Sequence, residues 1–221
     1  MTAIINQPAP QPQIECWCQG FEPPLDELAG QVILINVIQV NCTGCFVHSL
    51  PEVIRLHEEY KEQGLKVFAI ATAFEHFEHN TLNNLERLLQ RHELQGEPLA
   101  QLSRAGLLTN GRLPYEIPFS VAMDRLVKNS HQPTKEGIEQ FILSQIPDFH
   151  DSGLDDKRKQ AIFQQAEAYL EAKRYNALTF EQYNLQGTPS SILIDKQGIL
   201  RQVTFGMMNE LEDKIGQLLR E

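Results

Sequence analysis

Apolar positions along the chain follow two different periods, and the most informative stretch, Gln31 to Pro51, contains both. It begins with an apolar and largely β-branched run at 32–38, which is typical of a buried strand. After a short polar interval the apolar positions recur at helical spacing. One face of this predicted helix carries Val47, Leu50, Ile54, His57 and Tyr60. Because a second apolar run follows at 65–72, the pattern predicts a strand–helix–strand unit with parallel strands and a right-handed crossover.

The segments on either side of this unit give weaker signals. Residues 1–14 are rich in proline and glutamine and are expected to form a flexible N-terminal segment, followed by a short edge strand around Cys16. Beyond the unit, leucines at helical spacing predict a helix from Leu82 to about Leu94. A short helix is expected over 98–105 and a strand at 117–122, with its proline near the start where strands tolerate one.

The alternation of strands and helices is interrupted between Met123 and Leu185, where two helical patterns occur instead. It resumes with a predicted hairpin at 190–205 and a helix at 211–219. Since the alternation resumes, we interpret 123–185 as a helical insertion or lid within one domain that spans residues 1–221.

Composition and charge narrow the class of protein. A formal net charge of −10 argues against a nucleic-acid partner. No run approaches the length of apolar residues that a transmembrane helix needs, and the first residues do not resemble a signal peptide. Four cysteines are too few for a disulfide framework in a chain of 221 residues. We therefore expect a cytoplasmic protein, in which a lone C-x-x-C is catalytic or binds metal.

The C-x-x-C motif, Cys42-Thr43-Gly44-Cys45, lies between the buried strand and the helix. Its two sulfurs are about one helical turn apart, which is close enough for a disulfide. The unpaired N–H groups and the dipole of a helix N-terminus lower the pKa of a thiol placed there. A buried pair without a redox role is the alternative, but packing does not require cysteines at a helix start. The position therefore favours a redox-active dithiol.

Three motifs together resemble the thioredoxin superfamily, and within it the redoxin or TlpA-like group of thiol–disulfide oxidoreductases. They are the C-x-x-C after a strand, Gly187-Thr188-Pro189 before a hairpin, and a C-terminal helix. The resemblance covers 31–72 and 185–219 well and the region between them loosely. It implies an α/β thioredoxin-like fold, with a central mixed sheet flanked by helices and a helical insertion before the cis-proline hairpin.

The same resemblance implies roles for individual residues. Cys42 would be the attacking thiolate and Cys45 the resolving thiol. Pro189 would form a cis peptide bond beside the disulfide and leave the backbone of Thr188 free to pair with a substrate chain. The implied partners are disulfide-containing proteins and an upstream thiol reductant, with no organic cofactor and no metal. The positions expected to contact the substrate are Thr43, Gly44, Thr188 and Pro189.

Several positions depart from the family pattern. Asn36 stands where thioredoxin has a buried carboxylate, and Asn41 stands where the family has a tryptophan before its first cysteine. His48 lies nearly one turn after Cys45, so it could relay protons, although a half-buried polar residue without that role is an equal alternative. Pro51 comes one residue later than in typical TlpA-like sequences and should kink the helix.

Four other interpretations stay open at this point. Cys16 and Cys18 could join the C-x-x-C in an all-cysteine zinc site. The loop from Glu75 to His79 could bind a metal, but a solvated acidic loop is favoured. A peroxiredoxin is disfavoured because neither Cys42 nor Cys45 has a threonine or serine three residues before it. A binding scaffold of the same fold, with the insertion as its contact surface, would not need an intact C-x-x-C.

Overall fold

The computed structural model describes residues 2–129, 133–206 and 210–221. The chain folds into two compact units. The first comprises residues 1–126 and 177–221, and the second comprises residues 127–176.

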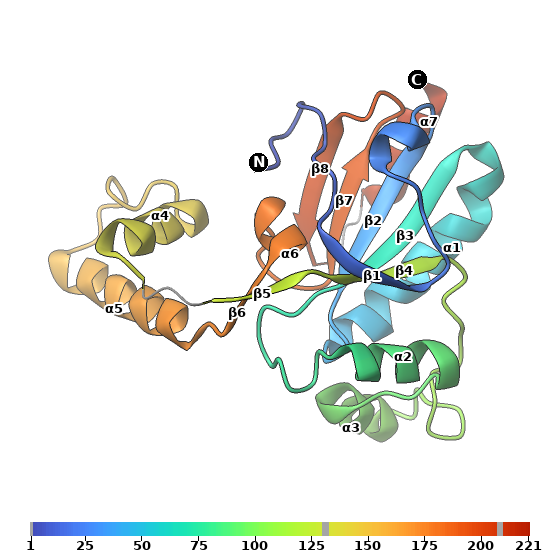
Figure 1. Ribbon diagram of the computed structural model, residues 1–221, viewed down its shortest axis with the longest axis horizontal. Helices are drawn as coiled ribbons and strands as arrows, with labels where there is room; N and C mark the ends of the chain where they lie inside the picture. Colours follow the sequence, from blue (N-terminus) through green and yellow to red (C-terminus); the bar gives the residue numbers. More distant parts are fainter. Residues whose placement is uncertain (1, 130–132, 207–209) are drawn as a thin grey trace. The chain divides into compact units, whose positions relative to one another are not determined.

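A six-stranded sheet forms the centre of the first unit (Figure 1). Its strands are β1 (Ile14–Gln19), β2 (Val32–Ile38), β3 (Leu65–Ala71), β4 (Ser120–Asp124), β7 (Ser190–Ile194) and β8 (Leu200–Phe205). They lie side by side in the order β1-β4-β3-β2-β7-β8. Strand β3 pairs in parallel with β2 and β4, whereas the other neighbours are antiparallel. The predicted parallel pair and the mixed sheet are therefore confirmed.

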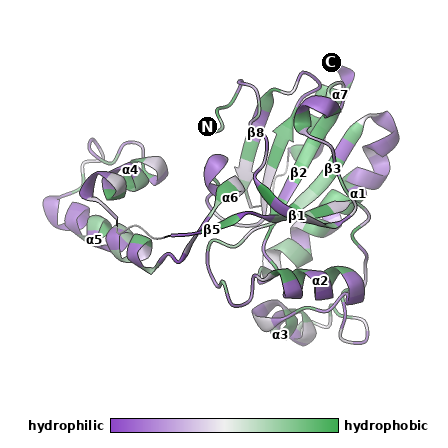
Figure 2. Ribbon diagram, in the orientation of Figure 1, coloured by the Kyte–Doolittle hydropathy of each residue, from purple (hydrophilic) through white to green (hydrophobic). Residues whose placement is uncertain are grey.

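Strand β2 is the centre of this sheet, and all seven of its residues are buried. Its side chains alternate between two hydrophobic clusters, because successive residues of a strand point to opposite faces. Val32, Leu34 and Ile38 belong to one cluster. Ile33, Ile35 and Val37 belong to the other. Figure 2 shows that hydrophobic residues are concentrated in the strands, whereas hydrophilic residues lie along helices such as α1 (Leu50–Tyr60).

The neighbouring strands and several helices supply the other members of both clusters. The cluster that contains Val32 also takes buried side chains from α1, α2 (Leu82–Arg91), α3 (Gly96–Arg104) and α7 (Leu211–Arg220). The opposite cluster takes them from the short helices η1 (Leu25–Leu28) and α6 (Leu178–Gln182). A further short turn, η3 (Lys61–Gln63), ends at Gly64, whose φ of 99° is left-handed and favours glycine. The predicted α/β thioredoxin-like fold, a sheet flanked by helices, is confirmed.

The second unit contains α4 (Lys135–Gln145) and α5 (Asp156–Ala172), which pack around their own small core. Threonine and aspartate side chains cap both helix starts: Thr134 accepts from the Gly137 N–H and Asp155 from the Arg158 N–H. A two-stranded sheet of β5 (Leu126–Lys128) and β6 (Tyr175–Ala177) lies where the chain passes between the units. The helical segment is thus narrower than the insertion predicted at 123–185, because Asp124 ends a strand of the main sheet and Leu178 begins α6.

The segment expected to be flexible, 1–14, is instead attached to the sheet edge along its described part. The Asn6 N–H donates to the Leu200 carbonyl, the Leu200 N–H donates to Gln7, and the Ala9 N–H donates to Gly198, at 2.8–2.9 Å. Its proline-rich composition indicated a trailing segment, but β8 is an edge strand with backbone groups free to pair. Among the described residues, no helix is both long and apolar enough to cross a membrane.

Candidate active site

The predicted dithiol lies at the carboxyl end of β2, and its two sulfurs form a disulfide. The Cα atoms of Cys42 and Cys45 are 5.3 Å apart, an ordinary span for a disulfide. Cys42 is half-buried, whereas Cys45 has no exposed surface. A second molecule can therefore reach the sulfur of Cys42 far more easily than that of Cys45.

Backbone groups surround the Cys42 sulfur. The Cys45 N–H donates to Cys42 Sγ at 3.1 Å. The carbonyl oxygen of Thr188 lies 3.5 Å from the same sulfur. An N–H donor and a helix N-terminus both favour negative charge on the Cys42 sulfur, whereas the carbonyl oxygen of Thr188 opposes it.

The helix after the dithiol begins with a π-helical turn, η2 (Cys45–Ser49), in which the Leu50 N–H donates to the Cys45 carbonyl five residues back. Regular α-helix resumes at Leu50. Pro51, the second residue of α1, has no N–H, so it cannot take part in the usual ladder with the preceding turn. A π turn therefore precedes Pro51, and such irregularities are often found at functional sites; the kink expected at Pro51 stays a prediction.

The loop before β7 forms the opposite wall of the site. The Thr188–Pro189 peptide bond is cis. This loop meets the C-x-x-C through the Thr188 carbonyl, and a Cβ placed on Gly44 would lie 3.7 Å from Pro189 Cδ. Gly187 is covered by the ring of Phe205, which would lie 2.5 Å from a Cβ at that position, so a larger residue would displace the ring.

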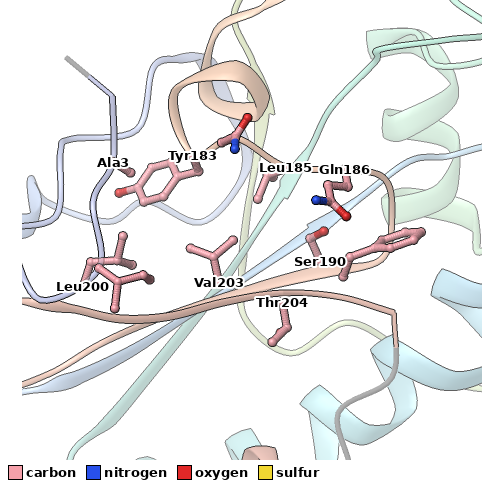
Figure 3. Close-up of a pocket in the computed structure, with 11 residues that line it drawn as sticks. Ala3, Tyr183, Leu185, Gln186, Ser190, Leu200, Val203 and Thr204 are labelled. Atoms are coloured by element: carbon pink, nitrogen blue, oxygen red, sulfur yellow. The ribbon is translucent and has the colours of Figure 1, made fainter. Parts of the chain in front are cut away.

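A cavity of about 310 Å³ lies beside this loop (Figure 3). The N-terminal segment, the loop after α6 and strand β8 line it through Ala3, Tyr183, Gln186 and Val203, among others. Figure 3 shows the side chains of Gln186, from the segment before β7, and Ser190, the first residue of β7, at this cavity. Neither cysteine of the disulfide lines this cavity.

Two buried amide side chains, which the sequence motifs did not identify, hold the loops around Cys42. Gln39 accepts a hydrogen bond from the Thr188 hydroxyl at 3.1 Å and donates to the Glu75 carbonyl at 3.2 Å. Asn80 Oδ1 accepts from the N–H of Asn41 at 2.9 Å. The available signal was their place in the chain: Gln39 follows a buried strand, and Asn80 ends the loop after the next one.

Among the remaining predicted site residues, Thr43 is half-buried between the two cysteines and His48 is exposed. No hydrogen bond or ion pair within the described ranges joins His48 to the dithiol, so its proton-relay role stays a prediction. Asn36 is fully buried and accepts a hydrogen bond from the Ser49 hydroxyl at 2.8 Å. A neutral amide thus occupies the position of the carboxylate in thioredoxin.

Cys16 and Cys18 lie on β1 with their sulfurs 3.9 Å apart, within hydrogen-bond distance for sulfur and not joined by a disulfide. Burial and the neighbouring Cys16 raise the pKa of Cys18 to about 12. The zinc alternative required all four cysteines to converge. Within the part of the chain that the structure describes, no three potential metal ligands come together, and this includes the loop from Glu75 to His79.

Comparison with known proteins adds structural matches only. No protein-family model and no curated protein sequence matches the chain. A thioredoxin-like superfamily protein of known structure is 25% identical, with 97% of both chains covered and a TM-score of 0.58. A thiol-disulfide isomerase from Corynebacterium glutamicum is 23% identical, with 98% of both chains covered and a TM-score of 0.57. A thioredoxin-like protein in its oxidized form has 15% identity and a TM-score of 0.52, with 97% of this chain and 96% of the other covered. These matches confirm the thioredoxin-like fold that the motifs indicate, and the chain resembles a thioredoxin-like superfamily protein at 25% identity over 97% of its length.

Proposed function

We propose that the protein is a thiol–disulfide oxidoreductase that uses Cys42 and Cys45 as its dithiol. The observation that carries the proposal is the asymmetry of the pair at a helix start. Cys42 is reachable and accepts the Cys45 N–H, whereas Cys45 is fully buried behind it. Exchange chemistry needs one thiolate that meets the substrate and a second thiol that only its neighbour can reach.

The reaction starts when a thiol reductant supplies two electrons and two protons to the Cys42–Cys45 disulfide. The Cys42 thiolate then attacks one sulfur of a substrate disulfide, forming a mixed disulfide and releasing the other sulfur as a thiolate. Cys45 loses its proton and attacks Cys42 Sγ. The Cys42–Cys45 disulfide forms again, the mixed disulfide breaks, and the second substrate sulfur leaves with the pair of electrons.

Disulfides within proteins are the substrates that this site suits best. The Thr188 carbonyl lies beside Cys42, and Pro189, which follows it, has no N–H that would compete for the same chain. An extended substrate segment could therefore pair with the backbone of Thr188 in the manner of an added strand. The upstream thiol reductant and a cytoplasmic location belong to the same proposal.

The Cys45→Ser variant tests the assigned roles. It should accumulate a mixed disulfide between Cys42 and a disulfide-bonded peptide, because the thiol that resolves this intermediate is gone. In the matched Cys42→Ser variant, burial of Cys45 should reduce adduct formation at Cys45 by at least about tenfold. Peptide mapping by mass spectrometry after acid quenching measures both adducts. Equal adduct levels in the two variants, or none in either, would contradict the proposal.

A further inference from the structure

The π turn that follows Cys45 leaves one backbone carbonyl without its helical partner. In a regular α-helix the Leu50 N–H would donate to the carbonyl of Phe46, four residues back. Here it donates to the Cys45 carbonyl instead. Phe46 is 1% exposed, so water cannot readily replace the missing donor. An unpaired carbonyl at such a position is costly.

A side chain from a distant part of the chain supplies that donor. The hydroxyl of Tyr115, in the segment between α3 and β4, donates to the Phe46 carbonyl at 2.6 Å. The ring packs against the same hydrophobic cluster that contains Cys45 and Phe46. Burial raises the pKa of the Tyr115 phenol, so the hydroxyl keeps its proton at neutral pH and remains a donor.

We propose that Tyr115 is a positioning residue for the dithiol, an inference that rests on the proposed function. By pairing with Phe46, it stabilises the π turn against the regular α-helical alternative, in which the Leu50 N–H would return to the Phe46 carbonyl. The π turn begins at Cys45, the residue whose N–H points at Cys42 Sγ. Tyr115 therefore acts on the Cys42 thiolate through the backbone of Cys45, without touching either sulfur.

The Tyr115→Phe variant removes this hydroxyl and keeps the ring. Without its donor, the turn can relax and the Cys45 N–H no longer holds its orientation toward Cys42. The reduced form depends on that N–H more than the disulfide does, because a thiolate is the stronger acceptor. We therefore expect the equilibrium with glutathione to move about threefold to tenfold toward the Cys42–Cys45 disulfide. The pH midpoint of Cys42 alkylation should rise in parallel.

Tyr183→Phe is a matched control. The Tyr183 hydroxyl also donates to a backbone carbonyl, that of Pro10, and burial raises its pKa in the same way. It is joined to Pro10 rather than to the helix that follows the dithiol. We expect this variant to lose about as much free energy of unfolding as Tyr115→Phe. Its glutathione equilibrium should stay within twofold of that of the wild-type protein, and the pH midpoint of Cys42 alkylation should not change.

The outcomes separate this inference from the proposed function. If the wild-type protein forms a reversible disulfide but Tyr115→Phe leaves both readouts unchanged, the role of Tyr115 is wrong and the proposed function stands. If the wild-type protein never forms a reversible disulfide, the proposed function itself fails.

Should Tyr115→Phe not fold, Pro51→Ala tests the same turn. It removes the ring that clashes with the carbonyl four residues back in a regular α-helix, so it should favour that helix and shift the equilibrium in the same direction. An unchanged equilibrium would contradict the inference.

Discussion

The Cys42→Ser variant should reduce a peptide disulfide at least about 1,000-fold more slowly than the wild-type protein. A serine hydroxyl is not ionised at neutral pH and cannot form the mixed disulfide. Cys45 cannot replace Cys42, because it is fully buried beneath it. Turnover with a dithiol reductant, after subtraction of the rate of the reductant alone, measures the loss.

A variant with both Cys16→Ser and Cys18→Ser is the control for this experiment. These two thiols are the free cysteines of the chain, and the pKa of Cys18 is raised to about 12, so it holds little thiolate at neutral pH. The control should keep the wild-type rate within twofold. If activity survives in Cys42→Ser and disappears in the control, Cys16 and Cys18 carry out the exchange and the role given to Cys42 is wrong.

The Asp124→Ala variant should lose roughly 2–4 kcal/mol in the free energy of unfolding. The buried carboxylate of Asp124 accepts hydrogen bonds from the Thr72 hydroxyl at 2.7 Å and from the N–H groups of Thr179 and Phe180 at 2.8 and 3.2 Å. The two N–H groups belong to the first turn of α6, which leads into the loop with Pro189. Alanine would leave all three donors buried and unpaired.

Urea unfolding measures this loss. Asp213→Ala is the matched control, because Asp213 also lies in the first turn of a helix but is exposed. Its change in the free energy of unfolding should stay within about 0.5 kcal/mol. A similar small change in Asp124→Ala would show that the carboxylate does not hold α6 to the sheet.

The same carboxyl group gives a pH dependence of known sign. Burial raises the pKa of Asp124, although its hydrogen bonds to Thr72 and Thr179 oppose the shift. A folded-state pKa above the unfolded value means that the group's contribution to stability is lost as pH rises through the folded pKa. The free energy of unfolding of the wild-type protein, relative to Asp124→Asn, should therefore increase as pH falls from 7 through that pKa. A decrease over this range would contradict the assignment.

The elements that could be predicted from the sequence are those whose local pattern has one structural solution. The short and largely β-branched apolar run at 32–38 favours a strand buried on both faces, and β2 is buried at every position. A cysteine pair directly after such a strand, followed by a helical pattern, left little choice for the position of the dithiol. The glycine-threonine-proline motif likewise placed the facing loop correctly.

The features that could not be predicted depend on partners distant in the sequence. Tyr115 lies 69 residues from the carbonyl that it caps, and Gln39 joins two loops through its buried amide. The attachment of residues 6–9 to the sheet depends on the free edge of β8, which the order of the strands creates. The side chain of His48, three residues after Cys45, is exposed, and its role in proton transfer stays a prediction.

The most direct test of the proposed function is the redox equilibrium of Cys42 and Cys45 with glutathione, measured by thiol alkylation and mass spectrometry over a series of thiol-to-disulfide ratios. We expect a reversible two-electron transition between a dithiol and a Cys42–Cys45 disulfide. Its potential should lie between about −270 and −120 mV, the range of related dithiols. If the two cysteines stay reduced at every ratio, or form only separate adducts with glutathione, the pair is not a redox-active dithiol and the proposed function is wrong.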